Sequence, residues 1–427
     1  MRNPYVTGPY VVGRKHYGRQ GLVDYLLHGT TPAYWVVGTQ RVGKTSLLRH
    51  LAWTAPKDHF LPVWWDMQGC DTFRQLGAVF VDAVNDCGEQ LQEIGFGAAS
   101  ALDDDVLTLL PRLVRAARKA SREVLLLCDE TEALIRLAGS APRSLQRLHA
   151  LLTAGNGLRV VAASTQAIYQ LHDLCRNWPT SSFLGGFDMS QTLGSLEPQE
   201  ARRLILQAQE PEPVRATPEV IEAVAERTNN QPYLIQLLCA RLFQESGSLR
   251  APGPDDLQID PALRGFLEAE FQLLTPVDRQ LLLEVSRARS VEESALGEAV
   301  HMGGAELRQH VHNLERLGHL RRARGGRLQL GNQFLSAWLA AEPEPASLME
   351  SPSQVSDVAM KAALAGQQAH EEHFLNSELN AHRARLVELE AVRARDLLTV
   401  SPHVLTEIEQ RQFHIQSLRR LLAKSAT

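Results

Sequence analysis

The stretch that decides the fold is Trp35-Val36-Val37-Gly38-Thr39-Gln40-Arg41-Val42-Gly43-Lys44-Thr45-Ser46-Leu47-Leu48. Residues 38–45 read Gly-x-x-x-x-Gly-Lys-Thr, which is the pattern of a phosphate-binding P-loop. The apolar and aromatic residues 33–37 before it predict a buried strand, and residues 44–53 have the apolar spacing of a helix. Because a P-loop lies between a strand and a helix, this context favours a true motif over a chance glycine-rich loop.

The residue types of this loop predict its chemistry. We expect Gly38 and Gly43 to give the backbone angles that a side chain would forbid. The loop amides can then point at phosphate oxygens, and the start of the following helix adds positive partial charge. Lys44 is expected to reach the β and γ phosphates, and the Thr45 hydroxyl to ligate Mg2+. The predicted phosphate-binding residues are Gly38, Thr39, Gln40, Arg41, Val42, Gly43, Lys44, Thr45 and Ser46.

A second apolar run supplies acidic residues for the same site. Residues 123–128 are mostly apolar in succession, which predicts a strand buried on both faces, and they end at Asp129 and Glu130. Beside a P-loop, this is the pattern of a Walker B strand. Asp129 would hold Mg2+ directly or through water, and Glu130 would orient and deprotonate the attacking water. The alternative is a strand that merely ends in solvated acids.

A further predicted strand, residues 158–165, ends in hydroxyl residues. Thr165 or Ser164 could sense the γ phosphate or the water, or could cap the next helix, and both interpretations stay open. Strands that alternate with helices predict a parallel α/β sheet with its ligand at the carboxyl ends of the strands. The other predicted elements are strands over 59–66 and 187–193 and helices over 73–94, 103–120, 166–174, 197–209 and 218–228.

Composition limits the classes of function. A chain of 427 residues is too long for one core, so two or three domains are expected. The formal net charge of −5 gives no overall attraction to nucleic acid or membrane. The five cysteines form no CxxC pair, which predicts reduced thiols and a cytoplasmic protein. No apolar run reaches about 18 residues, so we expect no membrane span.

The pattern along the chain predicts five segments. Residues after 195 become helical, residues 250–260 are rich in Pro, Gly and Asp, and a stretch rich in Pro, Glu and Ser follows residue 342. The tail has a near-heptad apolar spacing after Ser401-Pro402. The segments are a P-loop ATPase domain (1–195), a helical lid (196–250), a winged-helix domain (261–342), a linker (343–353) and a helical hairpin or coiled-coil tail (354–427).

The predicted winged helix carries a basic hairpin. Residues 301–327 contain six arginines against two glutamates, a local formal charge of +4. Its wing would present Arg321, Arg322, Arg324 and Arg327 to the phosphates of duplex DNA. The alternative is a winged helix that packs on protein. The tail could likewise pack on the body of the molecule, or bind a second copy or a protein partner.

Taken together, the chain resembles the STAND-class P-loop ATPases, the signal-transduction branch related to AAA+ proteins, and especially the archaeal-type and bacterial relatives with a winged helix. The resemblance implies an ASCE/AAA+-like P-loop NTPase fold. The resemblance covers about residues 8–340. Besides the P-loop and Asp129-Glu130, it rests on Val11-Val12-Gly13-Arg14, Leu196-Glu197-Pro198-Gln199-Glu200-Ala201 and Asn230-Gln231-Pro232.

The resemblance implies further roles for individual residues. Val12, Gly13 and Arg14 would contact the adenine side of ATP, and Pro232 would pack on the nucleotide from the lid. The chain departs from the family at Asn230, where the family prefers glycine.

The implied function is an ATP-binding and ATP-hydrolysing switch whose nucleotide state controls assembly or a partner interaction, as in signalling or anti-phage defence. The alternative is a DNA-acting AAA+ ATPase, similar to origin-recognition initiators or transposition regulators, that binds duplex DNA through the winged helix.

Overall fold

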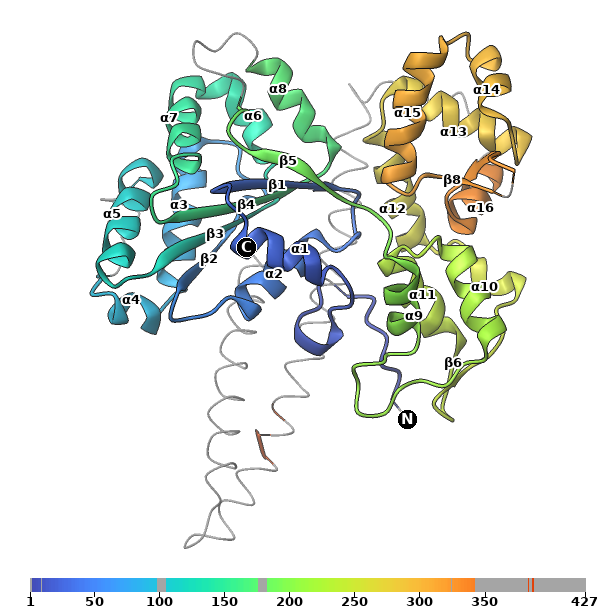
Figure 1. Cartoon of the computed structure of the whole chain (residues 1–427), viewed down its shortest axis with the longest axis horizontal. Helices are drawn as coiled ribbons and strands as arrows, with labels where there is room; N and C mark the ends of the chain where they lie inside the picture. Colours follow the sequence, from blue (N-terminus) through green and yellow to red (C-terminus); the bar gives the residue numbers. More distant parts are fainter. Residues whose placement is uncertain are drawn as a thin grey trace, which may run out of the picture. The chain divides into compact units, whose positions relative to one another are not determined.

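A computed structural model describes residues 2–8, 10–97, 105–175, 183–323 and 325–341, with the single positions 383, 386 and 387 (Figure 1). Arg324, the predicted linker and, apart from those three positions, the predicted tail lie outside the described residues. Residues up to 259, together with those from 270 to 341, pack as one unit, whereas residues 260–269 belong to another. The candidate site lies within the first unit.

A five-stranded parallel sheet forms the centre of the N-terminal half, in the order β2-β3-β4-β1-β5. Every residue of β1 is buried, and β3 and β4 are buried over nearly their whole length. Strands covered on both faces read as continuous apolar runs, which is why these were visible in the sequence. The strands are β1 (Ala33–Gly38), β2 (Phe60–Asp66), β3 (Glu123–Asp129), β4 (Leu158–Ser164) and β5 (Asp188–Leu193).

Helices cover both faces of this sheet (Figure 1). Tyr34 and Val36 of β1 pack with buried residues of α1 (Gln20–His28) and α2 (Lys44–Thr54). The alternate residues Trp35 and Val37 pack on the opposite face. This face is covered by α3 (Phe73–Asn85), α4 (Glu89–Glu93), α5 (Val106–Lys119), α6 (Ala133–Ser140), α7 (Pro142–Leu152) and α8 (Tyr169–Leu174).

Three predicted helices differ from the structure in their extent. The helix expected over 73–94 is broken into α3 and α4, because Gly88 takes a φ of +49°, a left-handed angle that favours glycine. The helix expected over 166–174 begins as a 3-10 turn, η2 (Gln166–Ile168), before α8. The helix expected over 197–209 is shorter, α9 (Pro198–Ile205), and Gln207 just beyond it has a φ of +46°.

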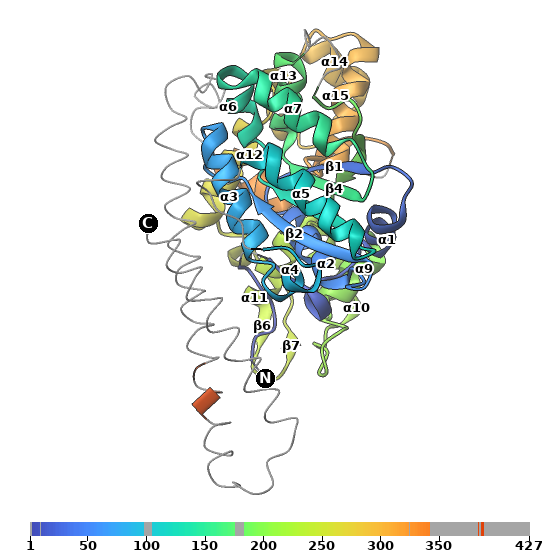
Figure 2. The same ribbon diagram turned by 90° about the vertical axis from the view of Figure 1, so that its left-hand side faces the viewer.

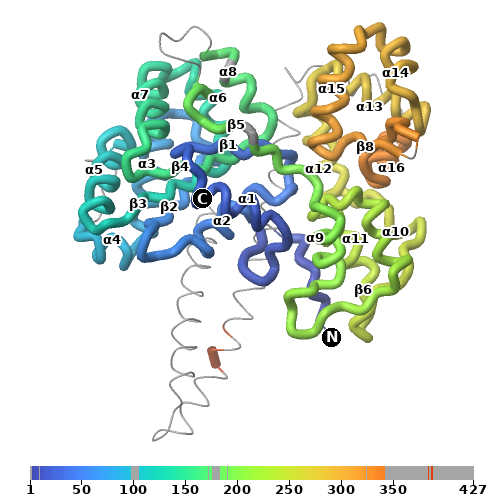
Figure 3. The backbone as a smooth tube through the Cα atoms, viewed as in Figure 1, coloured from blue at the N-terminus to red at the C-terminus, as the bar shows by residue number. Residues whose placement is uncertain are grey.

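The segment predicted as the lid is helical, as the tube in Figure 3 shows. We use the name lid for its three helices, α9, α10 (Pro218–Thr228) and α11 (Pro232–Leu242), with the short hairpin β6 (Phe243–Gln244) and β7 (Ser248–Leu249). The N-terminal segment is attached to it: Asn3 Nδ2 donates a hydrogen bond to the Ala240 carbonyl, and the Tyr5 hydroxyl donates to the Ile205 carbonyl. Short 3-10 turns lie at Gly13–Lys15 and Pro254–Leu257.

Helix α12 (Pro261–Gln272) was not predicted, and it precedes a compact group of elements that we call the C-terminal module (276–341; Figure 2). Phe271 at the end of α12 packs edge-on against Trp338, with 5.5 Å between ring centroids. The winged-helix assignment of this module stays a prediction. Its elements are α13 (Pro276–Ala288), α14 (Glu293–Ala299), α15 (Gly304–Arg316), β8 (Leu320–Arg322), β9 (Leu328–Leu330) and α16 (Gln333–Ala341).

Candidate nucleotide site

The predicted P-loop connects β1 to α2, which begins at Lys44. The buried Lys44 ammonium donates hydrogen bonds to the carbonyls of Gly38 (3.1 Å) and Thr39 (2.9 Å). Gly43 has a φ of +103°, so its backbone needs glycine, as predicted. The reason expected for Gly38 was wrong. Its φ is not positive; instead a Cβ there would lie 2.7 Å from the Leu193 carbonyl oxygen of β5, so glycine is needed for close packing.

Thr45 and Asp129 meet at the carboxyl end of the sheet. The Thr45 hydroxyl donates a hydrogen bond of 2.7 Å to Asp129 Oδ2. The other oxygen, Asp129 Oδ1, is buried and has no hydrogen-bond partner among the described residues. Burial raises the pKa of Asp129 to about 6, against the Thr45 hydrogen bond and the Lys44 charge, which lower it. A hydroxyl beside a carboxylate with a free oxygen fits the few oxygen ligands that proteins give Mg2+.

Glu130 follows directly and sits at the edge of the site. Its φ of +50° is unusual for a residue with a side chain, and the side chain is exposed. Desolvation of its carboxyl group raises its pKa, and the charges of Glu132 and Asp129 act in the same direction, while the Lys44 charge lowers it. A carboxylate with a raised pKa is suited to accept a proton from water.

Glu132 was not predicted and ties β4 to this loop. Its carboxylate accepts a hydrogen bond from the Thr165 backbone amide. The Thr165 hydroxyl accepts from the Ala167 amide at 3.4 Å, which is the helix-capping geometry, and the Ser164 hydroxyl accepts from the buried indole of Trp35 at 2.7 Å. In the sequence, Glu132 is distinguished only by its position two residues after Glu130, and that position alone indicates no role.

The segment predicted to face the adenine lies over α2. The Val11 amide donates to the Ser46 hydroxyl at 3.1 Å, and the Gly13 amide donates to His50 Nδ1 at 3.3 Å. Gly13 has a φ of +60°, and a Cβ there would lie 3.5 Å from the Trp53 ring. Val12 and Arg14 are exposed on either side of this glycine. The segment is therefore held against the first two turns of α2, and its contact with adenine stays a prediction.

Two elements distant in sequence contact the P-loop itself. The Arg41 guanidinium lies over the ring of Tyr233 in α11, 4.6 Å from its centroid, next to the predicted lid residue Pro232. The Gln40 backbone amide donates a hydrogen bond to the carboxylate of Glu270, at the end of α12. Glu270 lies 230 residues from its partner and has no motif around it, so no local pattern selects it.

The arginines of the predicted wing are ion-paired, apart from Arg324, which lies outside the described residues. Arg322 lies 2.8 Å from Glu293 and 2.9 Å from Glu315, and Arg327 lies 3.3 Å from Glu292. Arg321 lies 3.9 Å from Glu226 of the lid. The local charge of +4 therefore overstates the basic character, because folding brings in acids from outside that window.

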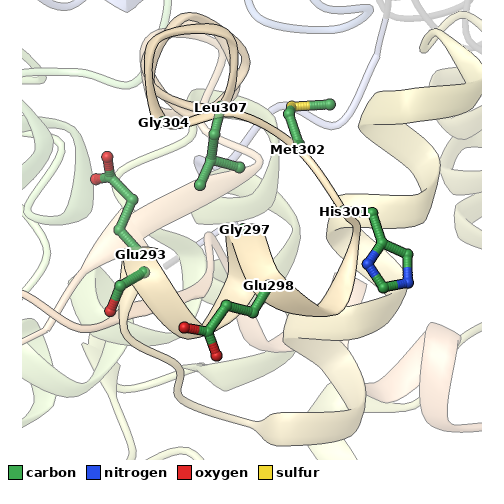
Figure 4. A pocket seen from close by; sticks show the side chains of 8 residues that line it. Glu293, Gly297, Glu298, His301, Met302, Gly304 and Leu307 are labelled. Carbon is green, nitrogen blue, oxygen red and sulfur yellow. The ribbon is translucent and has the colours of Figure 1, made fainter.

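A pocket between α14 and α15 adds to this acidic surrounding (Figure 4). Glu293 and Glu298 line it together with His301, Met302 and Leu307. Carboxylates at this position repel the phosphates of a nucleic acid.

Comparison with known proteins places the fold. No family model and no curated protein sequence matches the chain. The Walker-type ATPase PABY2304 of Pyrococcus abyssi matches 78% of this chain and 98% of its own, with a TM-score of 0.58 and 12% identity. The chain has the fold of a P-loop ATPase. The ORC2 protein of Aeropyrum pernix, in its ADPNP-ADP complexes, matches 81% of this chain and 95% of its own, with a TM-score of 0.47 and 14% identity. Among the described residues, no helix is both long and apolar enough to cross a membrane.

Proposed function

We propose that this P-loop ATPase fold binds and hydrolyses ATP, and that its nucleotide state controls assembly or a partner interaction. The observation that carries the proposal is the Thr45–Asp129 hydrogen bond of 2.7 Å beside the buried Lys44. It joins the first residues of α2 to the end of β3, so the phosphate-binding and acidic halves of the motif form one site.

Binding of the triphosphate would use the donors of the loop, with the Gln40 amide available once Glu270 releases it. The backbone amides of residues 40–45 and the start of α2 provide donors for phosphate oxygens. Lys44 would exchange its two carbonyl contacts for phosphate oxygens, since its ammonium keeps its full charge against neutral acceptors. Mg2+, when bound, would be held by Thr45 and Asp129 and would neutralise charge on the phosphates. The segment around Gly13 would lie on the base side.

Hydrolysis needs a proton acceptor at the γ phosphate, and we assign that task to Glu130. The water oxygen would form a bond to the γ phosphorus while the bond from that phosphorus to the β–γ bridging oxygen breaks, leaving ADP. Glu130 would orient the water and take its proton, which then passes to the released phosphate. Glu132 would hold the end of β4, and with it Thr165, beside this position.

A switch, rather than a simple hydrolase, is supported by what the P-loop contacts. Neighbouring loop residues, Gln40 and Arg41, contact α12 and α11 respectively. A phosphate that moves the loop amides would alter both contacts at once. Because packed interfaces tend to take discrete arrangements, such a change would pass to the lid and the C-terminal module.

The DNA-acting alternative is less favoured by the charges. Arg321, Arg322 and Arg327 all have carboxylate neighbours, and a duplex would meet those acids together with the arginines. Exposed ion pairs are weak, so they can be broken, but the acids would remain and reduce the release of counterions on which DNA affinity depends.

One experiment compares the two functions. Light scattering would measure the mass of Glu130→Gln protein in ATP and in ADP, with Glu222→Gln on α10 as a surface control that still hydrolyses ATP. We expect a different mass in ATP for Glu130→Gln. In parallel, fluorescence anisotropy would follow a labelled duplex at low and moderate salt. An unchanged mass, together with saturable DNA binding that is steeply salt-dependent, would contradict the switch and favour the DNA-acting ATPase.

A further inference from the structure

The contact between Glu270 and the P-loop joins two parts of the molecule that no motif connects. Glu270 is 6% exposed, and one oxygen of its carboxylate accepts a hydrogen bond of 2.5 Å from the Gln40 amide. Backbone amides of a P-loop are the groups that bind phosphate oxygens. A side-chain anion therefore contacts the loop through the type of donor that a nucleotide would use.

The electrostatic surroundings of Glu270 are also those of a phosphate. Burial raises the pKa of Glu270 to about 7, while the Gln40 amide and the Lys44 charge lower it and so favour the carboxylate. The nearby His319 has its Nε2 atom 3.8 Å from the second carboxylate oxygen. Burial lowers the pKa of His319 to about 4, so this imidazole is neutral at pH 7. The positive charge that favours the Glu270 carboxylate is thus that of Lys44, the residue expected to bind phosphate.

We propose that Glu270 is an internal ligand of the P-loop, which takes the place of a phosphate oxygen at the Gln40 amide and must leave before a nucleoside triphosphate can bind fully. The inference rests on the proposed function, because it assumes that this loop binds phosphate. Two anions cannot share one amide in a buried site, since the repulsion between them is strong where little water screens it. Nucleotide binding and the Glu270 contact are therefore mutually exclusive.

The release of Glu270 would be felt in the C-terminal module. The next residue, Phe271, packs on Trp338 of α16, and the Leu274 carbonyl accepts a hydrogen bond of 3.1 Å from Arg279 Nε in α13. These contacts fix the end of α12 to the module, so displacing the carboxylate moves or strains both. On the other side, Asn229 of the lid donates from Nδ2 to the Gly318 carbonyl, next to His319. Nucleotide binding in the P-loop would thereby change the contacts of the C-terminal module and of the lid.

Binding measurements test the proposal directly. Full-length wild type, Glu270→Ala and Glu270→Gln would be titrated with a fluorescent ATP analogue and Mg2+. The control is Glu284→Gln on α13, whose carboxylate pairs locally with Arg287. Removing a competing internal ligand should tighten binding about tenfold in Glu270→Ala, because the competent state becomes more populated. Glu270→Gln should tighten binding less, and Glu284→Gln should match wild type.

A second measurement tests whether the release of Glu270 loosens the segments around it. Hydrogen exchange of peptides covering 270–275 and 313–323 should rise in wild type when the ATP analogue binds. In Glu270→Ala it should already be high without nucleotide. Should Glu270→Ala fail to fold, as judged by its thermal transition, Glu270→Gln carries the same test, because it keeps the side-chain volume and removes only the charge.

The outcomes separate this inference from the proposed function. Equal affinities for wild type and both Glu270 variants, with nucleotide clearly bound, would overturn the internal ligand and leave the ATPase proposal intact. No binding by any variant would overturn the proposed function, and with it this inference. Binding by the Glu270 variants but not by wild type would support both.

Discussion

The P-loop and the β8–β9 hairpin both present cations that were expected to meet phosphate, but their surroundings differ. Lys44 is buried and donates to two backbone carbonyls, whereas Arg322 is partly exposed and lies between Glu293 and Glu315. Lys44 forms its hydrogen bonds with neutral carbonyls, and the carboxylates of Asp129 and Glu270 feel its charge without pairing with it directly. The two carboxylates beside Arg322 already neutralise it. A phosphate site is therefore indicated less by the number of cations than by what those cations contact.

The largest effect is expected at the acid beside the P-loop. Glu130→Gln keeps the size of the side chain but cannot take a proton, so kcat for ATP hydrolysis should fall by about 10²–10⁴-fold. Nucleotide affinity should stay near that of wild type, because the loop and Lys44 are intact. Steady-state phosphate release and equilibrium binding would check both parts. Equal turnover in the two proteins would show that Glu130 is not the base.

Removing the P-loop cation should weaken binding more than any change in the hairpin. Lys44→Ala deletes a buried, charge-assisted contact of about 2 kcal/mol, so ATP should bind about 30-fold more weakly. Titration calorimetry with ATP would measure the change, and Lys119→Ala, at the exposed end of α5, is the matched lysine control. If Lys44→Ala bound ATP like wild type, the loop would not be the phosphate site.

Replacing Asp129 should change how the free energy of unfolding depends on pH. The folded-state pKa of Asp129 is raised to about 6, above its unfolded value, so folding binds protons between these values and stability falls as pH rises through this window. Asp129→Asn removes the buried charge and should stabilise the protein by about 1–3 kcal/mol at pH 7.5. Thermal or urea unfolding at pH 7.5 and pH 5 would show the gain shrinking at the lower pH. A gain that is independent of pH would contradict this explanation.

The smallest effect is expected at the hairpin. Arg322→Glu breaks two exposed ion pairs, each worth about 0–1 kcal/mol, and places a third acid between Glu293 and Glu315. A modest loss of stability in urea and no change in duplex binding are expected. A marked loss of DNA affinity, with a shallower salt dependence, would mean that the pairs open and the hairpin does bind phosphates.

The sequence predicts what depends on near neighbours. Buried parallel strands appear as apolar runs, and the P-loop, Asp129 and Glu130 have local motifs, so the sheet and its acidic edge could be placed in advance. Glu270 could not be placed, because its role depends on a contact between residues 230 positions apart. The acids around the hairpin could not be placed for the same reason, since Glu226, Glu292 and Glu293 reach it only after folding.

The N-terminal segment has a mechanical consequence. The Val6 amide donates to the Gln236 side chain of the lid, and the Val11 amide donates to Ser46 of α2. The five-residue span between these anchors can extend no further than about 17 Å. While both hydrogen bonds persist, this segment is a short tether that limits how far α11 can move away from the P-loop. Deletion of residues 1–8 would remove this tether and allow the lid a larger displacement, without changing any residue of the predicted phosphate site.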